Sequence, residues 1–595
     1  MKVLFFSPFA NIWDHSFPEA LIAEGLVKQG ADVLYVRCDG MLNAHCVAMA
    51  ATGVDYRDSA ATRAQVCRAC IKRRMLIDNT MQFPSTVMDP LVTPADRDEA
   101  ERICASVNRE TWPNTMVNGV PLARYAAYEF ILDHKLVGTH IPAALWDLYL
   151  DQLRNTILVF RIAQRIIAAE SPTHLVVFNR LYSANHAFAA AAESVGIPTF
   201  TLQGGGHITR RAETMTMYRG SLSLADVFDA AAWQTYSRTP IGADEVALVG
   251  EHFSGLLEGS SAFAYSSAFE ASDPVALRER FGIPLDSRVL LAPLSSEDEI
   301  NAARLADALP HSNGQVSLFD GQFAWIAYLL EYAATHPRLH MIIRLHPRLF
   351  PNKRDNVQSP IVDELMALLA SPPTNVTLNL PTDDVSLYDI MQIVDVLLSF
   401  RSAVGAEVAA FGTPVVVPAN SDFFTYPDEI NLIGRTIDEY SAMIDRALDD
   451  GWSIENSRRA FRWYAFLFSR VAVDFSDSVH ARPIGIRPRK PGFRLWLWRK
   501  LVYLFIQFGP LVRERIALRN RRFPASSREL FMDVLGHQRG NLADSALWHK
   551  VKSSPRAETA LLEDYLGSLA NGLWKSIVVD DSLAGRIRAG VSSNG

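Results

Sequence analysis

The sequence predicts an α/β fold in which two Rossmann-like, doubly wound domains face each other across a cleft, followed by a helical C-terminal extension. Short apolar runs alternate with helical patterns in two separate stretches of the chain. A segment rich in Ser, Ala and Gly divides these stretches, and a basic segment with several prolines precedes the last part. The expected domain ranges are 1–257, 258–481 and 482–595.

The first domain opens with a β-α-β pattern. An apolar run at 3–7 is too short for a helix, and it is followed by a helical pattern at 17–29 and a second apolar run after Gly30. The same pattern returns at 174–202 and ends in Gln203-Gly-Gly-Gly-His207. Long helical patterns at about 122–135 and 143–170 predict a helical insertion between the two units.

The second domain shows a longer alternation of the same kind. Strands are expected at 289–292, 339–345, 376–380, 396–400 and 414–417, and helices at 321–335, 361–369, 387–394 and 403–411. Ligands of open parallel sheets bind beyond the carboxyl ends of the strands, where helix N-termini direct unpaired N–H groups outward. The loops that follow these strands are therefore the first place to look for a binding site.

Composition and charge exclude several classes of protein. With 49% hydrophobic residues the chain of 595 residues is long enough for several cores, so it is not disordered as a whole. A net charge of −7 argues against general nucleic-acid binding, and five cysteines cannot form a disulfide framework. No apolar run reaches 18 residues, so we expect a cytoplasmic protein without a spanning helix.

The first candidate site is the motif Arg344-Leu-His346-Pro-Arg348, directly after the strand expected at 339–345. Pro347 restrains the loop, which places His346 at the strand end, and the two arginines offer forked donors to phosphate or carboxylate. The alternative is a loop histidine with a purely structural role.

The second candidate site spans a strand end, a helix and the next strand. Ser399, Arg401 and Ser402 lie beside the positive end of the helix expected at 403–411, where an anion is stabilised. Glu407 lies one turn into that helix, where a carboxylate can accept hydrogen bonds from the two hydroxyls of a ribose. Alternatively, Ser402 is only a helix cap and Glu407 a solvated residue.

Together the His-Pro motif and the later Ser-x-x-Ser, Gly-x-Glu and Gly-x-Pro pattern resemble the C-terminal domain of nucleotide-sugar glycosyltransferases of the GT-B fold. The pattern is especially similar to bacterial capsule, sialyl/polysialyl, Kdo and teichoic-acid-polymer transferases, and it covers about 286–420. The resemblance implies that His346, Ser399 and Ser402 hold the phosphate and nucleotide of the donor, with a CMP-activated acidic sugar favoured.

The acidic catalytic motif of polysialyltransferases is not evident in the first half, so the resemblance does not assign the base. In the loop after the first strand, Asp14 or His15 could take a proton from an acceptor hydroxyl, alongside His346 on the donor side. Asp14 could equally cap the following helix.

Four cysteines, Cys38, Cys46, Cys67 and Cys70, fall within 33 residues and include a Cys-x-x-Cys pair. They could bind one structural zinc with tetrahedral geometry, although the first pair is widely spaced. The alternative is a set of reduced, partly buried thiols.

A basic and aromatic segment at 487–522 is the last informative feature. Tryptophans and phenylalanines alternate with arginines and lysines there, which predicts a helix lying on an anionic membrane surface. A core helix with arginines reaching to solvent is the alternative. No fold signature for single-stranded nucleic acid accompanies the aromatic residues.

The sequence thus predicts a metal-independent glycosyltransferase at the inner face of the cell membrane, using a nucleotide-sugar donor and a surface glycan or lipid-linked glycan acceptor. Two alternatives stay open: a non-hydrolysing UDP-sugar 2-epimerase, and a non-catalytic polysaccharide-assembly protein.

Overall fold

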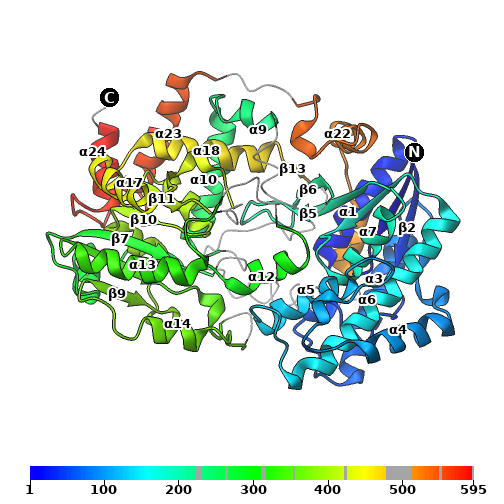
Figure 1. Ribbon diagram of the computed structural model, residues 1–595. Coiled ribbons are helices and arrows are strands. Elements are labelled where there is room, and N and C mark those ends of the chain that lie inside the picture. Colours follow the sequence, from blue (N-terminus) through cyan, green and yellow to red (C-terminus); the bar gives the residue numbers. More distant parts are fainter. Residues whose placement is uncertain are drawn as a thin grey trace, which may run out of the picture.

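A computed structural model describes residues 1–220, 231–260, 265–309, 316–352, 356–420, 425–476, 511–548 and 553–592. Two sheets form two separate lobes (Figure 1). Within each sheet the strand order runs outward in both directions from the first strand, as in doubly wound folds. The predicted fold class, α/β with two Rossmann-like domains, is confirmed.

The first sheet has seven strands in the order β13-β6-β5-β4-β1-β2-β3. The five strands from β3 to β5 are parallel, whereas β6 and β13 are antiparallel additions at one edge. The order reverses between β1 and β4, where Val3 pairs with both Val33 and His174. The bounds are β1 Lys2–Phe6, β2 Asp32–Arg37, β3 Ser85–Val87, β4 His174–Phe178, β5 Thr199–Gly204, β6 Thr214–Arg219 and β13 Ala472–Asp474.

Some helices in the first half of the chain begin at capping signals that are visible in the sequence. Ser59 accepts a hydrogen bond from the Thr62 N–H at the start of α3, and Thr93 and Asp96 form a capping box at the start of α4. The bounds are α1 Trp13–Lys28, α2 Val47–Ala50, α3 Ala60–Asp78, α4 Pro94–Ser106, α5 Leu122–His134, α6 Ala143–Glu170, α7 Ser183–Glu193, α9 Ala231–Tyr236 and α10 Ala243–Leu257. The helical insertion expected at 122–135 and 143–170 corresponds to α5 and α6.

The second sheet has six parallel strands in the order β12-β11-β10-β7-β8-β9, which reverses between β7 and β10. The strand bounds are β7 Arg288–Pro293, β8 Leu339–Arg344, β9 Val376–Asn379, β10 Val396–Leu398, β11 Val415–Pro418 and β12 Leu432–Gly434. The helix bounds are α11 Pro274–Arg280, α12 Glu297–Leu305, α13 Gly321–Thr335, α14 Val362–Leu368, α15 Leu387–Ile390, α16 Val404–Ala410, α17 Ile437–Asp450 and α18 Ile454–Ser469.

The C-terminal part of the chain is divided between the two cores. Phe531 on α22 (Ala525–Gly536) is buried in the first core beside α1, and α21 (Val512–Arg519) lies on the same domain. Leu566 on α23 (Pro555–Asn571) and Leu583 on α24 (Leu583–Ser592) are buried in the second core. The described part of the predicted extension is therefore built into both domains.

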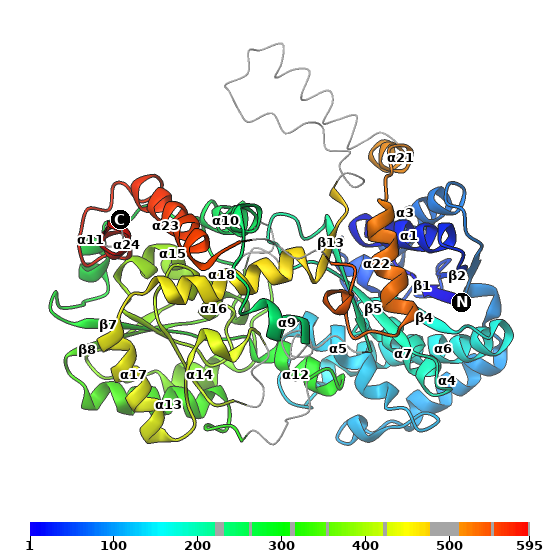
Figure 2. The same cartoon turned by 90° about the horizontal axis from the view of Figure 1, so that it is seen from above.

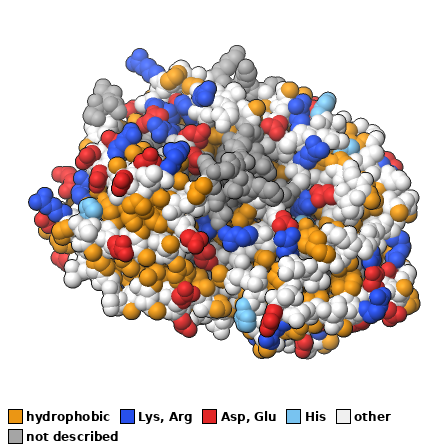
Figure 3. Space-filling model, in the orientation of Figure 1, with side chains coloured by type: hydrophobic (Ala, Val, Ile, Leu, Met, Phe, Trp, Pro, Cys, Tyr) orange, Lys and Arg blue, Asp and Glu red, His pale blue; other side chains and the backbone are white. Residues whose placement is uncertain are grey.

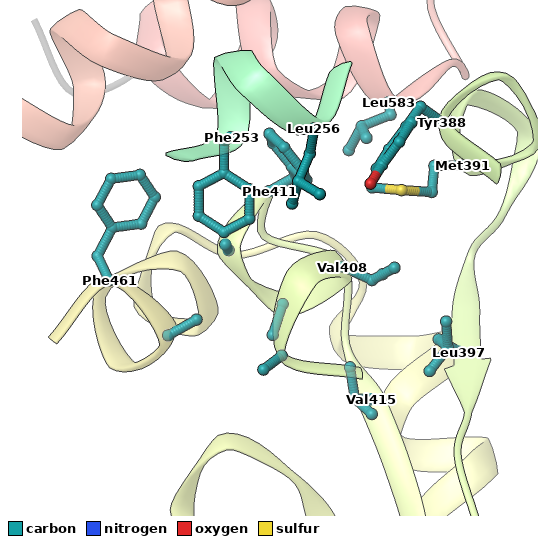
Figure 4. Close-up of a cluster of buried hydrophobic side chains, with 14 of the residues drawn as sticks. Phe253, Leu256, Tyr388, Met391, Leu397, Val408, Phe411, Val415, Phe461 and Leu583 are labelled. Carbon is teal, nitrogen blue, oxygen red and sulfur yellow. The ribbon is translucent and has the colours of Figure 1, made fainter. Parts of the chain in front are cut away.

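The second core also includes α10, which the sequence ranges assigned to the first domain. Phe253 and Leu256 of α10 pack near Phe411 and Phe461, and Leu583 closes the same cluster (Figure 4). Trp233 of α9 is buried in the same core, so α9 and α10 both pack with the second domain although they precede residue 257.

The two domains meet where α5 lies beside α12, as both cartoon views show (Figures 1 and 2). The fully buried Lys135 donates through Nζ to the Phe350 carbonyl oxygen at 3.0 Å and to the Val357 carbonyl oxygen. The Asn301 side chain donates to the Gly138 carbonyl oxygen at 2.9 Å. Buried polar contacts therefore fix the first domain against the second.

In the part of the chain that the structure describes, none of the helices combines the length and apolar character needed to cross a bilayer. Most of the basic segment at 487–522, namely 487–510, lies outside the described residues.

Candidate functional site

A cavity of about 520 Å³ opens at the carboxyl ends of β7, β8 and β10 in the second sheet. The strand order reverses between β7 and β10, and such switch points are where ligands bind in open α/β sheets. Tyr128, Leu181 and Ile208 line the cavity from the first half of the chain. The cavity therefore lies between the carboxyl edge of the second sheet and the facing domain.

His346 lines this cavity directly after β8, as expected. Its Nδ1 accepts a hydrogen bond from the Arg348 N–H at 3.2 Å, and its ring meets the Tyr265 ring edge-on at 5.4 Å. Because Nδ1 accepts, the proton of the neutral ring is assigned to Nε2. His346 can therefore offer an N–H donor through Nε2.

Arg344, the last residue of β8, also lines the cavity. Its guanidinium donates to the Asn379 side-chain oxygen and to the Val385 carbonyl oxygen at 3.0 Å, and among the described residues no carboxylate lies within ion-pair distance. Burial lowers the pKa of Arg344 to about 10. A half-buried cation held only by neutral oxygens is a favourable neighbour for an anionic ligand.

Arg401 and Ser402 line the cavity from the loop after β10. Arg401 forms an ion pair with Glu297 and lies 4.8 Å from the centre of the Phe400 ring. The Ser402 hydroxyl accepts weakly from the Val404 N–H at 3.4 Å. The N-cap of α16 is Ala403 and no side chain caps this helix, so Ser402 is not the cap that the sequence suggested; Ser402 lines the cavity.

Ser399 has a different position from the one expected for a phosphate ligand. It is fully buried, does not line the cavity, and exchanges hydrogen bonds of 3.2 Å with the Ser402 backbone through its hydroxyl. Gly405 is equally structural, because a Cβ there would lie 1.8 Å from the Tyr426 hydroxyl. These two residues shape the loop that presents Arg401 and Ser402.

Glu407 lines the cavity from α16, within reach of the Tyr388 hydroxyl, which donates to it at 3.4 Å. Burial raises the pKa of Glu407 to about 7, although the Tyr388 hydrogen bond opposes the shift. Its carboxylate is not ion-paired to any described residue, so it can accept hydrogen bonds from ligand hydroxyls.

The loop after β7 was not predicted as part of the site, yet Ser295, Ser296 and Glu299 of this loop line the cavity. The buried Gln322 side chain accepts from the Ser295 N–H at 2.7 Å and donates to the Ser295 carbonyl oxygen at 3.2 Å. The Ser295 hydroxyl has no hydrogen-bond partner among the described residues. The signal was present, because Ser-Ser-Glu-Asp-Glu follows a strand and opens a helix, as at the other two loops.

Arg348 does not line the cavity as the sequence suggested. Its guanidinium binds the buried Asp298 at 2.7–2.8 Å and donates to the Leu132 carbonyl oxygen at 2.7 Å. These partners hold the arginine at the domain interface, away from the cavity lining where the sequence placed it.

Asp14 and His15 lie in the first turn of α1, outside the lining of this cavity. Asp14 pairs with Arg513 at 3.2 Å, and the His15 ring stacks on Phe178 at 4.0 Å. Burial lowers the pKa of His15 to about 4, with Arg211 adding to the shift. The structure therefore does not bring the predicted base to the donor side of the cleft.

The four cysteines do lie together. Cys38, Cys46, Cys67 and Cys70 line one small cavity of about 20 Å³ in the first domain. Burial raises the pKa of Cys38 to about 12 and also raises those of the other three thiols. No group of three or more His, Cys, Asp or Glu residues in the described ranges is placed to hold a metal, and the cysteines are free thiols.

Fold and cavity together define a two-domain α/β protein with a cavity at the switch point of its second sheet, where several polar side chains join an apolar lining. No protein-family model matches the chain, and no curated protein matches it.

Solved structures with a similar arrangement include a sugar-nucleotide epimerase and two transferases. The UDP-GlcNAc 2-epimerase from Neisseria meningitidis, bound to UDP-GlcNAc, is 12% identical over 78% of this chain and 97% of its own, with a TM-score of 0.23. The calicheamicin glycosyltransferase CalG4 is 13% identical over 79% and 94%, with a TM-score of 0.25. A β-Kdo 2,4 transferase, KpsC from Thermosulfurimonas dismutans, is 13% identical over 49% and 88%, with a TM-score of 0.28. Similarity at this level leaves the function to be argued from the residues of the cavity.

Proposed function

We propose that the cavity binds a nucleotide-sugar donor and that the protein transfers the sugar to a glycan acceptor. The observation that carries the proposal is Arg344, a cation that donates to neutral oxygens and has no ion pair among the described residues, at a cavity that His346 and Ser402 also line. An anionic group at this point would compensate the guanidinium charge and receive the hydrogen bonds of the other two side chains.

The chemistry follows from the charge that develops during transfer. The bond between the anomeric carbon and the phosphate oxygen breaks, and negative charge accumulates on the departing nucleotide. Arg344, His346 and Ser402 would stabilise that charge in place, which lowers the barrier without a metal ion. Glu407 would accept hydrogen bonds from the ribose hydroxyls and so orient the nucleotide.

The acceptor hydroxyl loses its proton as its oxygen bonds to the anomeric carbon. We propose that Glu299, an exposed carboxylate on the cavity, takes this proton. Ser296 donates a hydrogen bond to Glu299 and so orients it, and Tyr128 lines the same cavity from the opposite domain. This carboxylate replaces Asp14 and His15 as the candidate base.

The positive charge of the cavity favours a donor with one phosphate. Arg401 is already compensated by Glu297, so Arg344 is the guanidinium among the described lining residues that has no carboxylate partner. This supports a CMP-activated sugar over a nucleoside diphosphate sugar. We further propose that the enzyme works at the inner face of the membrane, with 487–522 on anionic lipid and a surface glycan as acceptor.

The test is a melting assay of the full chain with CMP, CDP, UDP and GDP, followed by turnover with the nucleotide sugar that binds. We expect CMP to raise Tm most, because bound ligand stabilises the folded state. Interconversion of a UDP-sugar without acceptor would instead identify an epimerase. Nucleotide binding without turnover would identify a non-catalytic protein, and no shift with any nucleotide would refute the site.

A further inference from the structure

Two helices of the first domain, α3 and α21, lie side by side at its surface (Figure 2). Arg73 on α3 pairs with Glu514 on α21 at 2.9 Å and also donates to the Asn11 side chain at 2.6 Å. Arg513 on α21 pairs with Asp14 at 3.2 Å. These contacts hold α21 against the folded domain.

The exposed side of α3 is basic. Arg68, Lys72 and Met75 follow each other at spacings of four and three residues, which places them on one face of the helix. All three are exposed, and Met75 keeps 50% of its surface accessible although it is apolar. This face therefore combines two cations with an exposed hydrophobic side chain.

The exposed side of α21 has the same composition. Arg515 and Arg519 are exposed one turn apart, and Ile516 between them is 43% exposed. We call six of the exposed residues of the two helices the basic face: Arg68, Lys72, Met75, Arg515, Ile516 and Arg519.

No carboxylate of these helices offsets the basic face. Asp78, the acidic residue of α3, pairs with Arg37 at 2.7 Å and with Arg74 at 3.7 Å, and Glu514 of α21 is buried against Arg73. Among the described residues, none forms an ion pair with Arg68, Lys72, Arg515 or Arg519. By contrast, acidic and basic side chains are interspersed over the view in Figure 3.

We propose that the basic face binds the surface of an anionic phospholipid membrane. The four cations attract the headgroups, and Met75 and Ile516 enter the interface between headgroups and acyl chains. The exposed apolar side chains favour lipid over a soluble polyanion, because a polyanion in water offers them nothing to bury against. In the sequence, Trp496 and Trp498 precede the start of α21 by 16 and 14 residues, and tryptophan near basic residues is typical of interfacial segments.

The inference rests on the proposed membrane association and adds α3, an element far from 487–522 in the sequence. The experiment uses flotation of the full chain with vesicles of phosphatidylcholine alone or mixed with phosphatidylglycerol. The test variant is Arg68→Ala/Lys72→Ala on α3. The matched control, Arg97→Ala/Arg102→Ala, removes two exposed arginines from α4 of the same domain.

We expect the α3 variant to bind mixed vesicles at least about tenfold more weakly than the wild type, since each removed cation weakens attraction to an anionic surface. The α4 control should bind as the wild type. If the α3 variant bound vesicles as the wild type does, the role of the basic face would be overturned, while association through 487–522 would still stand. If no form bound vesicles, both proposals would be overturned. Equal capture by a soluble anionic polysaccharide would also overturn the inference, in favour of a polyanion site. CMP should raise Tm by the same amount in the wild type and in both variants. This Tm shift tests the nucleotide site independently of vesicle binding.

Discussion

His346 is the residue whose role follows most directly from its local contacts. The Arg348 N–H fixes Nδ1 as an acceptor, which directs the Nε2 proton away from the backbone. We expect His346→Ala to lower kcat by about tenfold or more, because a donor to the departing phosphate is lost. Tm should hardly change, because the ring lies at the cavity and not in a core.

The control for this variant is His140→Ala, an exposed histidine that does not line the cavity. It should leave kcat unchanged. If His346→Ala also left kcat unchanged, the assignment of His346 to the donor phosphate would be refuted.

The raised pKa of Glu407 predicts that nucleotide affinity depends on pH. Burial raises its pKa to about 7, so the free carboxyl becomes protonated as the pH falls through this value. A protonated carboxyl is a poorer acceptor for two ribose hydroxyls, and we expect CMP affinity to fall with it. Titration calorimetry on either side of pH 7 should show this trend for the wild type. The Glu407→Gln variant should bind CMP more weakly at every pH, and its affinity should not change around pH 7. If the affinity of the variant fell with pH as in the wild type, another group would be responsible for the titration.

At the scale of single elements, α22 connects the C-terminal part of the chain to the first domain. Phe531 is fully buried in the first core, and its ring lies 6.0 Å from that of Phe523. We expect Phe531→Ala to lower the free energy of unfolding by about 3–5 kcal/mol, the usual cost of emptying such a site. Ser526→Ala, an exposed change on the same helix, should cost little. Equal urea midpoints for the two variants would contradict this placement of α22.

The same packing affects how membrane association can be tested. Removing the chain from residue 487 onward would delete α22 from the first core and Leu566 and Leu583 from the second. Such a truncation would unfold both domains, so surface substitutions are the better probe.

Most elements of the fold are predictable from the sequence, because buried parallel strands are short apolar runs bounded by turns. The runs at 174–178 and the helices at 143–170 and 321–335 agree with β4, α6 and α13. The edge strands β6 and β13 were not predicted. Three residues of β13 pair with β6 across more than two hundred residues of chain, and no local pattern contains that pairing.

The candidate site was predictable in its location but not in the role of each residue. His346, Arg401 and Ser402 were predicted because they follow strand ends, and they do line the cavity. Arg348 and Ser399 are residue types that often bind phosphate, yet both have partners within the protein: Asp298 on α12 for the arginine, and the backbone of Ser402 in the same loop for the serine. Such partners appear only when the chain is folded.

At the scale of the whole molecule, Lys135 fixes the relative position of the domains. Its charged Nζ is fully buried and donates to two carbonyl oxygens of the second domain. Lys135→Met would remove both buried, charge-assisted hydrogen bonds that Nζ donates across the domain interface. We expect lower Tm and a larger radius of gyration by X-ray scattering, since the domains separate more easily.

CMP affinity of this variant should stay within about twofold of the wild type, because Lys135 does not line the cavity. Arg124→Ala is the control: it removes an exposed ion pair with Asp307 at the same interface and should have little effect. A wild-type scattering profile for Lys135→Met would show that other contacts set the domain arrangement.

The proposed function requires the switch point of the second sheet to hold the phosphate of a nucleotide sugar. A crystal structure of the full chain with bound CMP would show where this phosphate lies. We expect the phosphate within hydrogen-bonding distance of Arg344 and His346, with the ribose beside Glu407. A nucleotide bound elsewhere, or with its phosphate turned away from both side chains, would contradict it.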